Sequence, residues 1–290
     1  MSKTLKAGAR QIDLSAPICM GIINTTPDSF SDGSNLAAQT SGRFVVDVDK
    51  ALRVAESMLE EGASIVDVGG ESTRPGAAEV GLQEEMDRVL PVVEAIHQRL
   101  DICISVDSST PELMSAAVAA GAELLNDVRA LNREGALDAA AKSGAAICLM
   151  HMRGQPGTMQ NEIDYSDVVE EVSEYLASRL AACRNAGVEQ ERLLIDPGFG
   201  FGKTVEHNFQ LLRSLPAFAM HNTPILVGLS RKSMLGAVTG REVDQRLAAS
   251  IAAATLALQG GARIIRSHDV AATMDAIRVH CAFEESAPGE

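Results

Sequence analysis

The chain has no tryptophan, and aromatic residues make up only 3% of its 290 residues. Cations are scarce as well, since 25 Lys and Arg face 39 Asp and Glu and leave a net charge of −14. Nucleic acids and anionic membranes bind proteins through fields of Lys and Arg, so this charge balance excludes both as expected partners. Any anionic substrate must therefore be held by a few local cations.

Long apolar runs are also missing. No uninterrupted apolar stretch reaches the roughly 18 residues of a membrane helix, and the N-terminus carries no apolar segment of the signal-peptide type. The five cysteines show no disulfide or metal spacing, and Cys19, Cys103 and Cys148 lie inside apolar runs as small core residues. We therefore expect a cytoplasmic protein that does not bind membranes.

Apolar residues make up 46% of the chain and are mostly aliphatic, which favours helices packed on buried strands and thus an α/β fold. Residues 192–203, RLLIDPGFGFGK, show the basic unit. A short apolar run ends at Asp196, a proline stops strand pairing, and Gly198, Gly200 and Gly202 form a loop whose backbone can approach a ligand. Taken alone, this stretch could equally be an ordinary turn, but the pattern recurs along the chain.

The unit of a short apolar run followed by a helical segment occurs eight times. The expected strands span residues 18–23, 64–68, 102–106, 123–125, 145–150, 192–195, 225–227 and 263–265. The expected helices span residues 44–60, 83–99, 111–120 after an N-cap at Thr110, 134–142, 166–186, 205–214, 244–259 and 270–282. Together they predict a single (β/α)8 TIM-barrel domain over residues 1–290, with an N-terminal arm at 1–16 and long loops after strands 1 and 2.

A doubly wound open sheet is the competing architecture. It is disfavoured because no G-x-G-x-x-G follows the first strand and no change in composition marks a second domain. In a barrel the active site lies at the C-terminal ends of the strands. Those ends carry Asn24, Arg74, Asp107, Asn126, His151, Asp196, Lys232, Arg266 and His268.

Acceptor groups at three of these strand ends indicate the kind of ligand. Asp107, Asn126 and Asp196 offer two carboxylates and an amide, which suit a flat heterocycle with several N–H donors. Buried carboxylates without partners are costly, so a ligand with matching donors explains them economically.

Cationic groups at other strand ends indicate an anion. Arg74, Arg266 and His268 supply donors for a phosphate or pyrophosphate, close to where barrels commonly bind phosphate. A two-metal hydrolase would need an H-x-H pair near the first strand, which the sequence lacks, whereas Mg²⁺ held by Asn24, waters and phosphate oxygens fits better. Lys232 leaves a Schiff-base aldolase open as a further alternative.

The motifs that carry these residues resemble those of dihydropteroate synthases over almost the whole chain. The matching segments are residues 20–33, 67–77, 105–112, 126–128, 150–160, 196–203, 228–236 and 266–270. One departure is Ser34, where the family usually has a second glycine, and it concerns only the shape of the first loop.

The resemblance implies an enzyme of folate biosynthesis that joins 6-hydroxymethyl-7,8-dihydropterin pyrophosphate to 4-aminobenzoate, giving 7,8-dihydropteroate and pyrophosphate, with Mg²⁺ as cofactor. It implies that the catalytic residues are Asp107, Asp196, Lys232 and Arg266, and that the pterin is bound by these four together with Asn126. For the pyrophosphate it implies Asn24, Arg74, Arg266 and His268, with Asn24 also on Mg²⁺. Around 4-aminobenzoate it implies Phe30, Thr73, Pro75, Phe201, Lys232 and Ser233.

Two alternatives share the acidic pterin site. A pterin-dependent methyltransferase barrel has no need of pyrophosphate ligands, and Arg74, His268 and the Ser-Arg-Lys stretch at 230–232 argue against it. A non-catalytic pterin-binding homologue would keep the site without activity.

The expected helix at 246–259 is apolar nearly all round, so we also expect a partner to cover its outer side in a homodimer.

Overall fold

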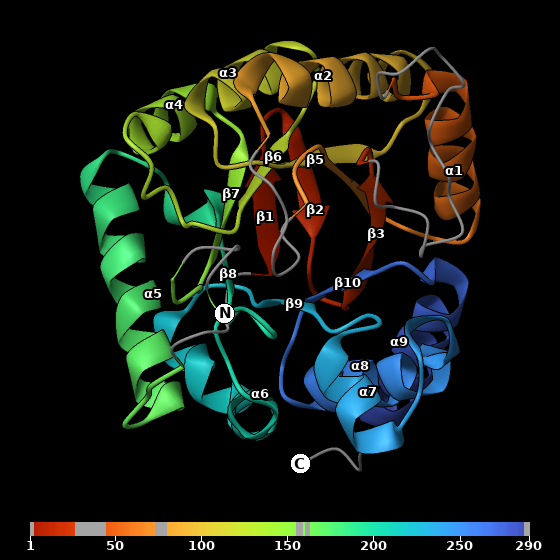
Figure 1. The fold of residues 1–290 in the computed structure, drawn as a ribbon, viewed down its shortest axis with the longest axis vertical. Coiled ribbons are helices and arrows are strands. Elements are labelled where there is room, and N and C mark those ends of the chain that lie inside the picture. The colour runs from red at the N-terminus through yellow and green to blue at the C-terminus, as the bar shows by residue number, and fades with distance from the viewer. Residues whose placement is uncertain (1–2, 27–44, 73–79, 155–158, 160–162, 287–290) are drawn as a thin grey trace.

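The computed structural model describes residues 3–26, 45–72, 80–154, 159 and 163–286. Parallel strands form a ring and helices cover its outside (Figure 1), so the expected TIM barrel is confirmed. The strands are β3 Ile18–Asn24, β4 Ile65–Gly69, β5 Cys103–Asp107, β6 Leu124–Asp127, β7 Ala146–Met150, β8 Leu193–Asp196, β9 Leu226–Gly228 and β10 Ile264–Ser267. Their order is β8-β7-β6-β5-β4-β3-β10-β9, and an isolated parallel bridge between Ile195 and Ile225 brings the two ends of the sheet together.

The expected arm at the N-terminus contains a hairpin of β1 Thr4–Ala7 and β2 Arg10–Asp13. Leu5, Ile12 and Leu14 from this segment pack in one hydrophobic cluster with residues inside the barrel. The hairpin therefore closes one end of the barrel, and the opposite end is left for the site.

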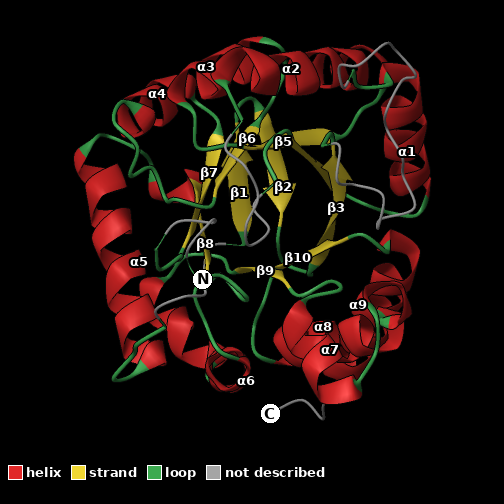
Figure 2. Cartoon of the chain, in the orientation of Figure 1, coloured by secondary structure: helices red, strands yellow, loops and turns green. Residues whose placement is uncertain are grey.

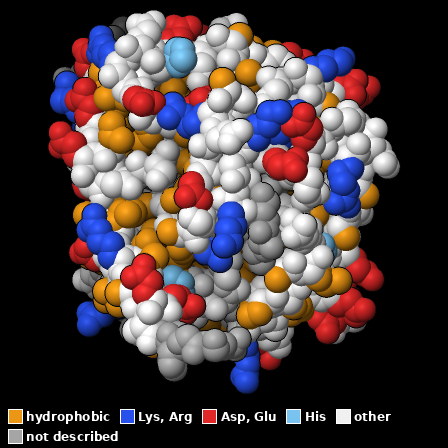
Figure 3. All heavy atoms as spheres, turned by 180° about the vertical axis from the view of Figure 1, so that it is seen from behind, with side chains coloured by type: hydrophobic (Ala, Val, Ile, Leu, Met, Phe, Trp, Pro, Cys, Tyr) orange, Lys and Arg blue, Asp and Glu red, His pale blue; other side chains and the backbone are white. Residues whose placement is uncertain are grey.

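Helices surround the strands on all sides (Figure 2). They are α1 Val48–Glu60, α2 Leu82–Arg99, α3 Pro111–Ala119, α4 Ala136–Ser143, α5 Val168–Asn185, α6 Val205–Arg213, α7 Ser233–Thr239, α8 Leu247–Gln259 and α9 Val270–Glu285. No helix in the described part of the chain has both the length and the apolar character of a membrane span. On the face shown in Figure 3, Lys and Arg side chains are scattered among Asp and Glu rather than gathered.

Some helix boundaries differ from the sequence-based expectation. The first helix begins at Val48 because Asp47 caps it, accepting a hydrogen bond from the backbone N of Lys50 at 2.9 Å. Thr110 precedes α3 as expected, but its hydroxyl donates to Glu85 instead of capping the helix. The short helix α7 was not expected, since its seven residues are too few to show helical periodicity.

Alternation along the strands determines which side chains face the inside of the barrel. Inward positions in the middle of the strands are Met20, Ile65, Cys103, Leu124, Cys148, Leu194, Leu226 and Ile264, which share one hydrophobic cluster. Residues two further along each strand face the same way, so the next inward positions toward the C-terminal ends are Ile22, Asp67, Ser105, Asn126, Met150, Asp196, Gly228 and Arg266. The inside of the barrel thus changes from apolar to largely polar side chains over two residues of each strand.

Candidate active site

A cavity of about 740 Å³ opens at the C-terminal ends of the strands. It is large enough for a drug-sized ligand. Nine sequence-predicted site residues line it: Asn24, Asp107, Asn126, Asp196, Phe201, Lys232, Ser233, Arg266 and His268. Phe30, Thr73, Arg74 and Pro75 lie outside the described residues, and His151, also expected at the rim, does not line the cavity.

Strand register places one row of side chains along the cavity. Asn24 on β3 pairs with Gly69 on β4, Gly69 with Asp107 on β5, and Asp107 with Asn126 on β6. A Cβ on Gly69 would lie 3.5 Å from Cβ of Asp107 and 3.9 Å from Oδ1 of Asn24. The glycine therefore leaves space between the amide of Asn24 and the carboxylate of Asp107.

An arginine that lines the cavity, Arg266, is shared by two carboxylates. Nε of Arg266 donates to Asp67 at 2.6 Å, and its Nη2 donates to Asp107 at 3.1 Å. Burial raises the pKa of Asp107 to about 7; the Arg266 charge opposes this shift and the Asp67 charge adds to it. Sequence reasoning missed Asp67, which lies inside an apolar strand and is fully buried.

Asp196 and Lys232 both line the cavity, and their charges act on each other. Asp196 accepts a hydrogen bond from the backbone N of Gly198 at 2.7 Å, and burial raises its pKa. Nζ of Lys232 donates to the carbonyl of Phe199 and lies 4.3 Å from the ring centroid of Phe201. Burial lowers the pKa of Lys232 to about 8, against the opposing charge of Asp196.

A second lysine supports the glycine-rich loop from beneath. Nζ of Lys203 donates to the carbonyls of Gly198 at 2.8 Å and Phe201 at 3.1 Å, and it lies 2.9 Å from Nδ1 of His151. Burial lowers the pKa of His151 to about 2, so its neutral ring can accept this contact. The expectation that His151 belongs to the rim is therefore corrected: it is buried under the loop, and Lys203, which sequence reasoning passed over, is its partner.

Glycine is required at the start of this loop. Gly198 has a φ of +71°, and a Cβ at this position would come 1.8 Å from the carbonyl oxygen of His151. Any side chain here would push the loop away from the strand that precedes His151. The loop therefore approaches β7 closely enough for Lys203 to bridge the two segments.

The loops after β9 and β10 are tied together beside the cavity. Both the backbone N and Nδ1 of His268 contact Oγ of Ser230, at 3.2 and 3.0 Å. Arg231, which has a φ of +57°, pairs with Asp269 through two contacts, and its backbone N donates to Ser250 at 2.9 Å. Ser230 and Arg231 also line the cavity, although sequence reasoning named them only as part of a motif.

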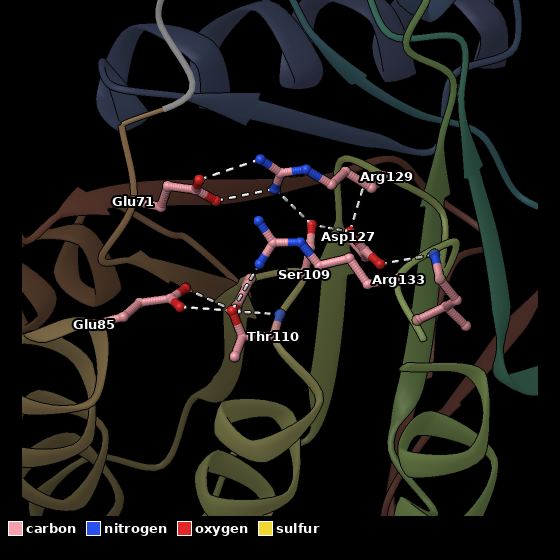
Figure 4. Close-up of polar contacts among 9 residues, drawn as sticks. Glu71, Glu85, Ser109, Thr110, Asp127, Arg129 and Arg133 are labelled. Carbon is pink, nitrogen blue, oxygen red and sulfur yellow. Dashed lines mark hydrogen bonds and ion pairs between the residues drawn. The ribbon is translucent and has the colours of Figure 1, made fainter. Parts of the chain in front are cut away.

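A buried network holds the chain where it leaves β4 (Figure 4). Both guanidinium NH₂ groups of Arg129 bind Glu71, at 3.0 and 3.1 Å. Arg129 also donates to Ser109 at 3.0 Å, and Ser109 in turn donates to Asp127. Asp127 accepts from the backbone N of Arg129 at 2.8 Å, which closes the network. Glu71, which lines the cavity, is thus fixed from behind by residues that follow β5 and β6.

The cavity offers few protein donors to the expected Mg²⁺. Within the described residues, no group of three or more His, Cys, Asp or Glu side chains is arranged to hold a metal ion. The amide oxygen of Asn24 is a hard donor at the cavity wall. Mg²⁺ commonly keeps several waters and binds through one or two protein oxygens plus substrate phosphates, so this donor set fits it.

Comparisons with known proteins agree with this geometry. Residues 20–268 match the family described as pterin binding enzyme. The dihydropteroate synthase of Haemophilus influenzae is 52% identical over 275 residues, which cover 95% of this chain and 97% of that protein. The Burkholderia cenocepacia dihydropteroate synthase complexed with 7,8-dihydropteroate superposes with a TM-score of 0.86 at 46% identity, covering 98% of this chain and 97% of that one. The Xanthomonas albilineans enzyme with 4-aminobenzoic acid gives a TM-score of 0.89 at 47% identity, covering 99% and 100%. The chain belongs to the dihydropteroate synthase family of pterin-binding enzymes.

Proposed function

We propose that the cavity is the place where 6-hydroxymethyl-7,8-dihydropterin pyrophosphate reacts with 4-aminobenzoate. The observation that carries this proposal is the convergence of Asp107, Asn126, Asp196, Lys232 and Arg266 on one cavity. The ligands named for the related structures, 7,8-dihydropteroate and 4-aminobenzoic acid, are the product and the second substrate of this reaction. A pterin-dependent methyltransferase is disfavoured because the relatives that align over nearly the full chain are dihydropteroate synthases.

The acidic side of the cavity suits the pterin ring. Asp107 and Asp196 are acceptors when ionised, and the ring of a dihydropterin presents several N–H donors. As the bond to pyrophosphate weakens, positive charge develops on the pterin methylene, and two carboxylates nearby stabilise it. Arg266, held by its pairs with Asp67 and Asp107, would stack its guanidinium on the ring.

The cationic side suits the leaving group. Arg266 and His268 would donate to the pyrophosphate oxygens, and Asn24 would hold Mg²⁺ through its amide oxygen. Mg²⁺ bound there would neutralise part of the charge on the departing pyrophosphate. Arg74 keeps its predicted place in this set, although it lies outside the described residues.

The remaining wall suits the aminobenzoate. Phe201 offers an aromatic ring with Lys232 beside it, and Ser233 lines the same cavity. The amine of 4-aminobenzoate forms a C–N bond to the pterin methylene while the C–O bond to pyrophosphate breaks, and the amine then loses one proton. Lys232 would hold its ammonium group between Asp196 and the aromatic ring during this step.

Pyrophosphate release by the purified protein tests the proposal and separates its alternatives. We expect release from the pterin pyrophosphate only when 4-aminobenzoate is present. A non-catalytic pterin-binding protein would release none under any condition. Release at the same rate without 4-aminobenzoate would identify a hydrolase and overturn the proposal.

A further inference from the structure

A single buried carboxylate, that of Asp67, binds two residues that line the cavity and one residue beside them. Asp67 on β4 is fully buried and accepts hydrogen bonds from Oγ of Ser105 at 2.6 Å, Nδ2 of Asn126 at 3.0 Å and Nε of Arg266 at 2.6 Å. These partners lie on β5, β6 and β10. Asp67 is therefore the point at which four strands of the barrel are joined by polar contacts.

This carboxylate determines which way the amide of Asn126 faces. An ionised carboxylate accepts hydrogen bonds and donates none, so only the NH₂ group of Asn126 can face Asp67. The amide oxygen of Asn126 then lies on the other side of a residue that lines the cavity. A reversed amide would place two oxygens against each other in a buried site and is strongly disfavoured.

The same carboxylate fixes the guanidinium of Arg266. Asp67 accepts a hydrogen bond from Nε of Arg266 and Asp107 accepts one from Nη2. These two hydrogen bonds fix the plane of the guanidinium. Without Asp67, the guanidinium would keep only its hydrogen bond to Asp107 and could rotate about it. Asp67 thus controls both an acceptor and a cation of the cavity without lining it.

We propose that Asp67 is a positioning residue that sets the hydrogen-bond polarity of the pterin site. It turns the Asn126 oxygen toward the ligand, so that the acidic side of the cavity presents acceptors only, and it holds the plane of Arg266. A ring with N–H donors is accepted by this arrangement, and a ring with acceptors at the same positions is rejected. The inference rests on the proposed function of the cavity.

Two substitutions separate orientation from charge. Asp67→Ala removes the acceptor, so the Asn126 amide can turn its NH₂ group toward the donors of the pterin. Asp67→Asn keeps the contacts, since its oxygen can accept from Asn126 and Arg266 while its NH₂ group donates to the hydroxyl of Ser105. Ser105→Ala is the matched control, because it removes one contact of Asp67 and leaves the other two in place.

Calorimetric titration with the pterin pyrophosphate, together with the KM for each substrate, gives the readout. We expect Asp67→Ala to weaken pterin affinity about ten- to a hundredfold, while the KM for the aminobenzoate substrate changes less than about threefold. Asp67→Asn should retain an affinity between those of Asp67→Ala and the unchanged protein, and Ser105→Ala should stay within about threefold. The inference would be overturned if Asp67→Ala bound the pterin pyrophosphate as tightly as the unchanged protein does. It would also be overturned if the KM for the aminobenzoate substrate rose by the same factor as the pterin affinity fell.

A second pair of variants keeps the side-chain volumes, in case Asp67→Ala does not fold. Asn126→Asp places two carboxylates against each other, and adding Asp67→Asn restores an N–H···O contact with the roles exchanged. Nε of Arg266 donates to the same Oδ2 atom of Asp67 as Asn126 does, so it loses this acceptor in the double variant and the rescue is partial. We expect the double variant to bind the pterin pyrophosphate at least about threefold more tightly than Asn126→Asp. Additive losses would contradict the orienting role. If the unchanged protein does not bind the pterin at all, the proposed function fails, whatever the variants do.

Discussion

Arg231 and Asp269 form a two-point ion pair that joins the loop after β9 to the start of α9. Nη2 of Arg231 lies 2.6 Å from Oδ1 of Asp269 and Nε lies 3.1 Å from Oδ2, with both side chains about one-fifth exposed. Lys232 follows Arg231 directly and His268 precedes Asp269. This pair therefore connects the proposed aminobenzoate side of the cavity with the proposed pyrophosphate side.

Breaking this pair should affect both stability and catalysis. We expect Asp269→Ala to lower the free energy of unfolding by about 1–3 kcal/mol, because it leaves a partly buried guanidinium without its carboxylate. The KM for the pterin pyrophosphate should rise as His268 loses its fixed neighbour. Asp275→Ala is the matched control, since it breaks the exposed pair with Arg278 and should cost about 0–1 kcal/mol. Urea unfolding and steady-state kinetics of both variants check this, and equal effects would contradict it.

The pH dependence of kcat/KM should form a narrow bell. Asp107 must be ionised to pair with Arg266 and to stabilise the positive charge on the pterin methylene, and its pKa is raised to about 7, so activity falls as the pH drops below that value. Lys232 must carry its proton, and its pKa is lowered to about 8, so activity falls again above that value. Lys232→Arg should remove the alkaline limb and keep the acidic one. A profile that is flat from about pH 6 to 9 would show that neither group governs the reaction.

Replacing Asp196 should separate catalysis from folding. Asp196→Asn keeps the volume and can still accept the hydrogen bond from Gly198, but it presents an NH₂ group in place of a carboxylate oxygen. We expect kcat to fall by about 10²–10³, while the free energy of unfolding changes by about 1 kcal/mol or less. Normal turnover in this variant would mean that the acidic side of the cavity is wrongly assigned.

Mg²⁺ should be required, with Asn24 as its protein contact. Chelation should abolish pyrophosphate release, and added Mg²⁺ should restore it. Asn24→Leu keeps a similar volume without the amide oxygen, so we expect it to need a higher Mg²⁺ concentration for half-maximal activity. Full activity in the presence of a chelator would mean that the reaction needs no metal.

We propose that the outer face of α8 and its neighbours forms a homodimer interface. Leu256 on α8 is 52% exposed, and Val279 and Phe283 on the adjacent α9 are 68% and 63% exposed. Sedimentation at micromolar concentration should show a dimer, and Leu256→Glu combined with Val279→Glu should yield monomer. Met220→Glu is the control, because this exposed residue lies beside Ser173 of α5, in the chain segment before β9. A monomer of the unchanged protein would contradict the proposal.

Much of the site could be predicted because barrel strands repeat one simple rule. Each short apolar run ends at the same rim, so polar residues such as Asp107, Asn126 and Asp196 were identified from their position alone. Asp67 was missed because it interrupts an apolar run in mid-strand. Side chains alternate along a strand, so Asp67, two residues after the inward-facing Ile65, must also face the inside of the barrel.

Other features depend on contacts between distant segments. His151 follows the inward-facing Met150 on β7, so alternation turns its side chain away from the cavity, where it meets Lys203. The network of Arg129 and Glu71 joins segments 58 residues apart, and no local pattern reveals such a pair. The sequence therefore predicts the ends of strands well and the supports behind them poorly.

The most direct measurement quantifies pyrophosphate and 7,8-dihydropteroate in the same reaction, with the pterin pyrophosphate and 4-aminobenzoate as substrates. If the cavity forms the C–N bond, the two products appear in equal amounts. Both should fall together, by about 10²–10³, in the Asp196→Asn variant. Pyrophosphate without dihydropteroate, or dihydropteroate formed at an unchanged rate by the variant, would contradict this mechanism.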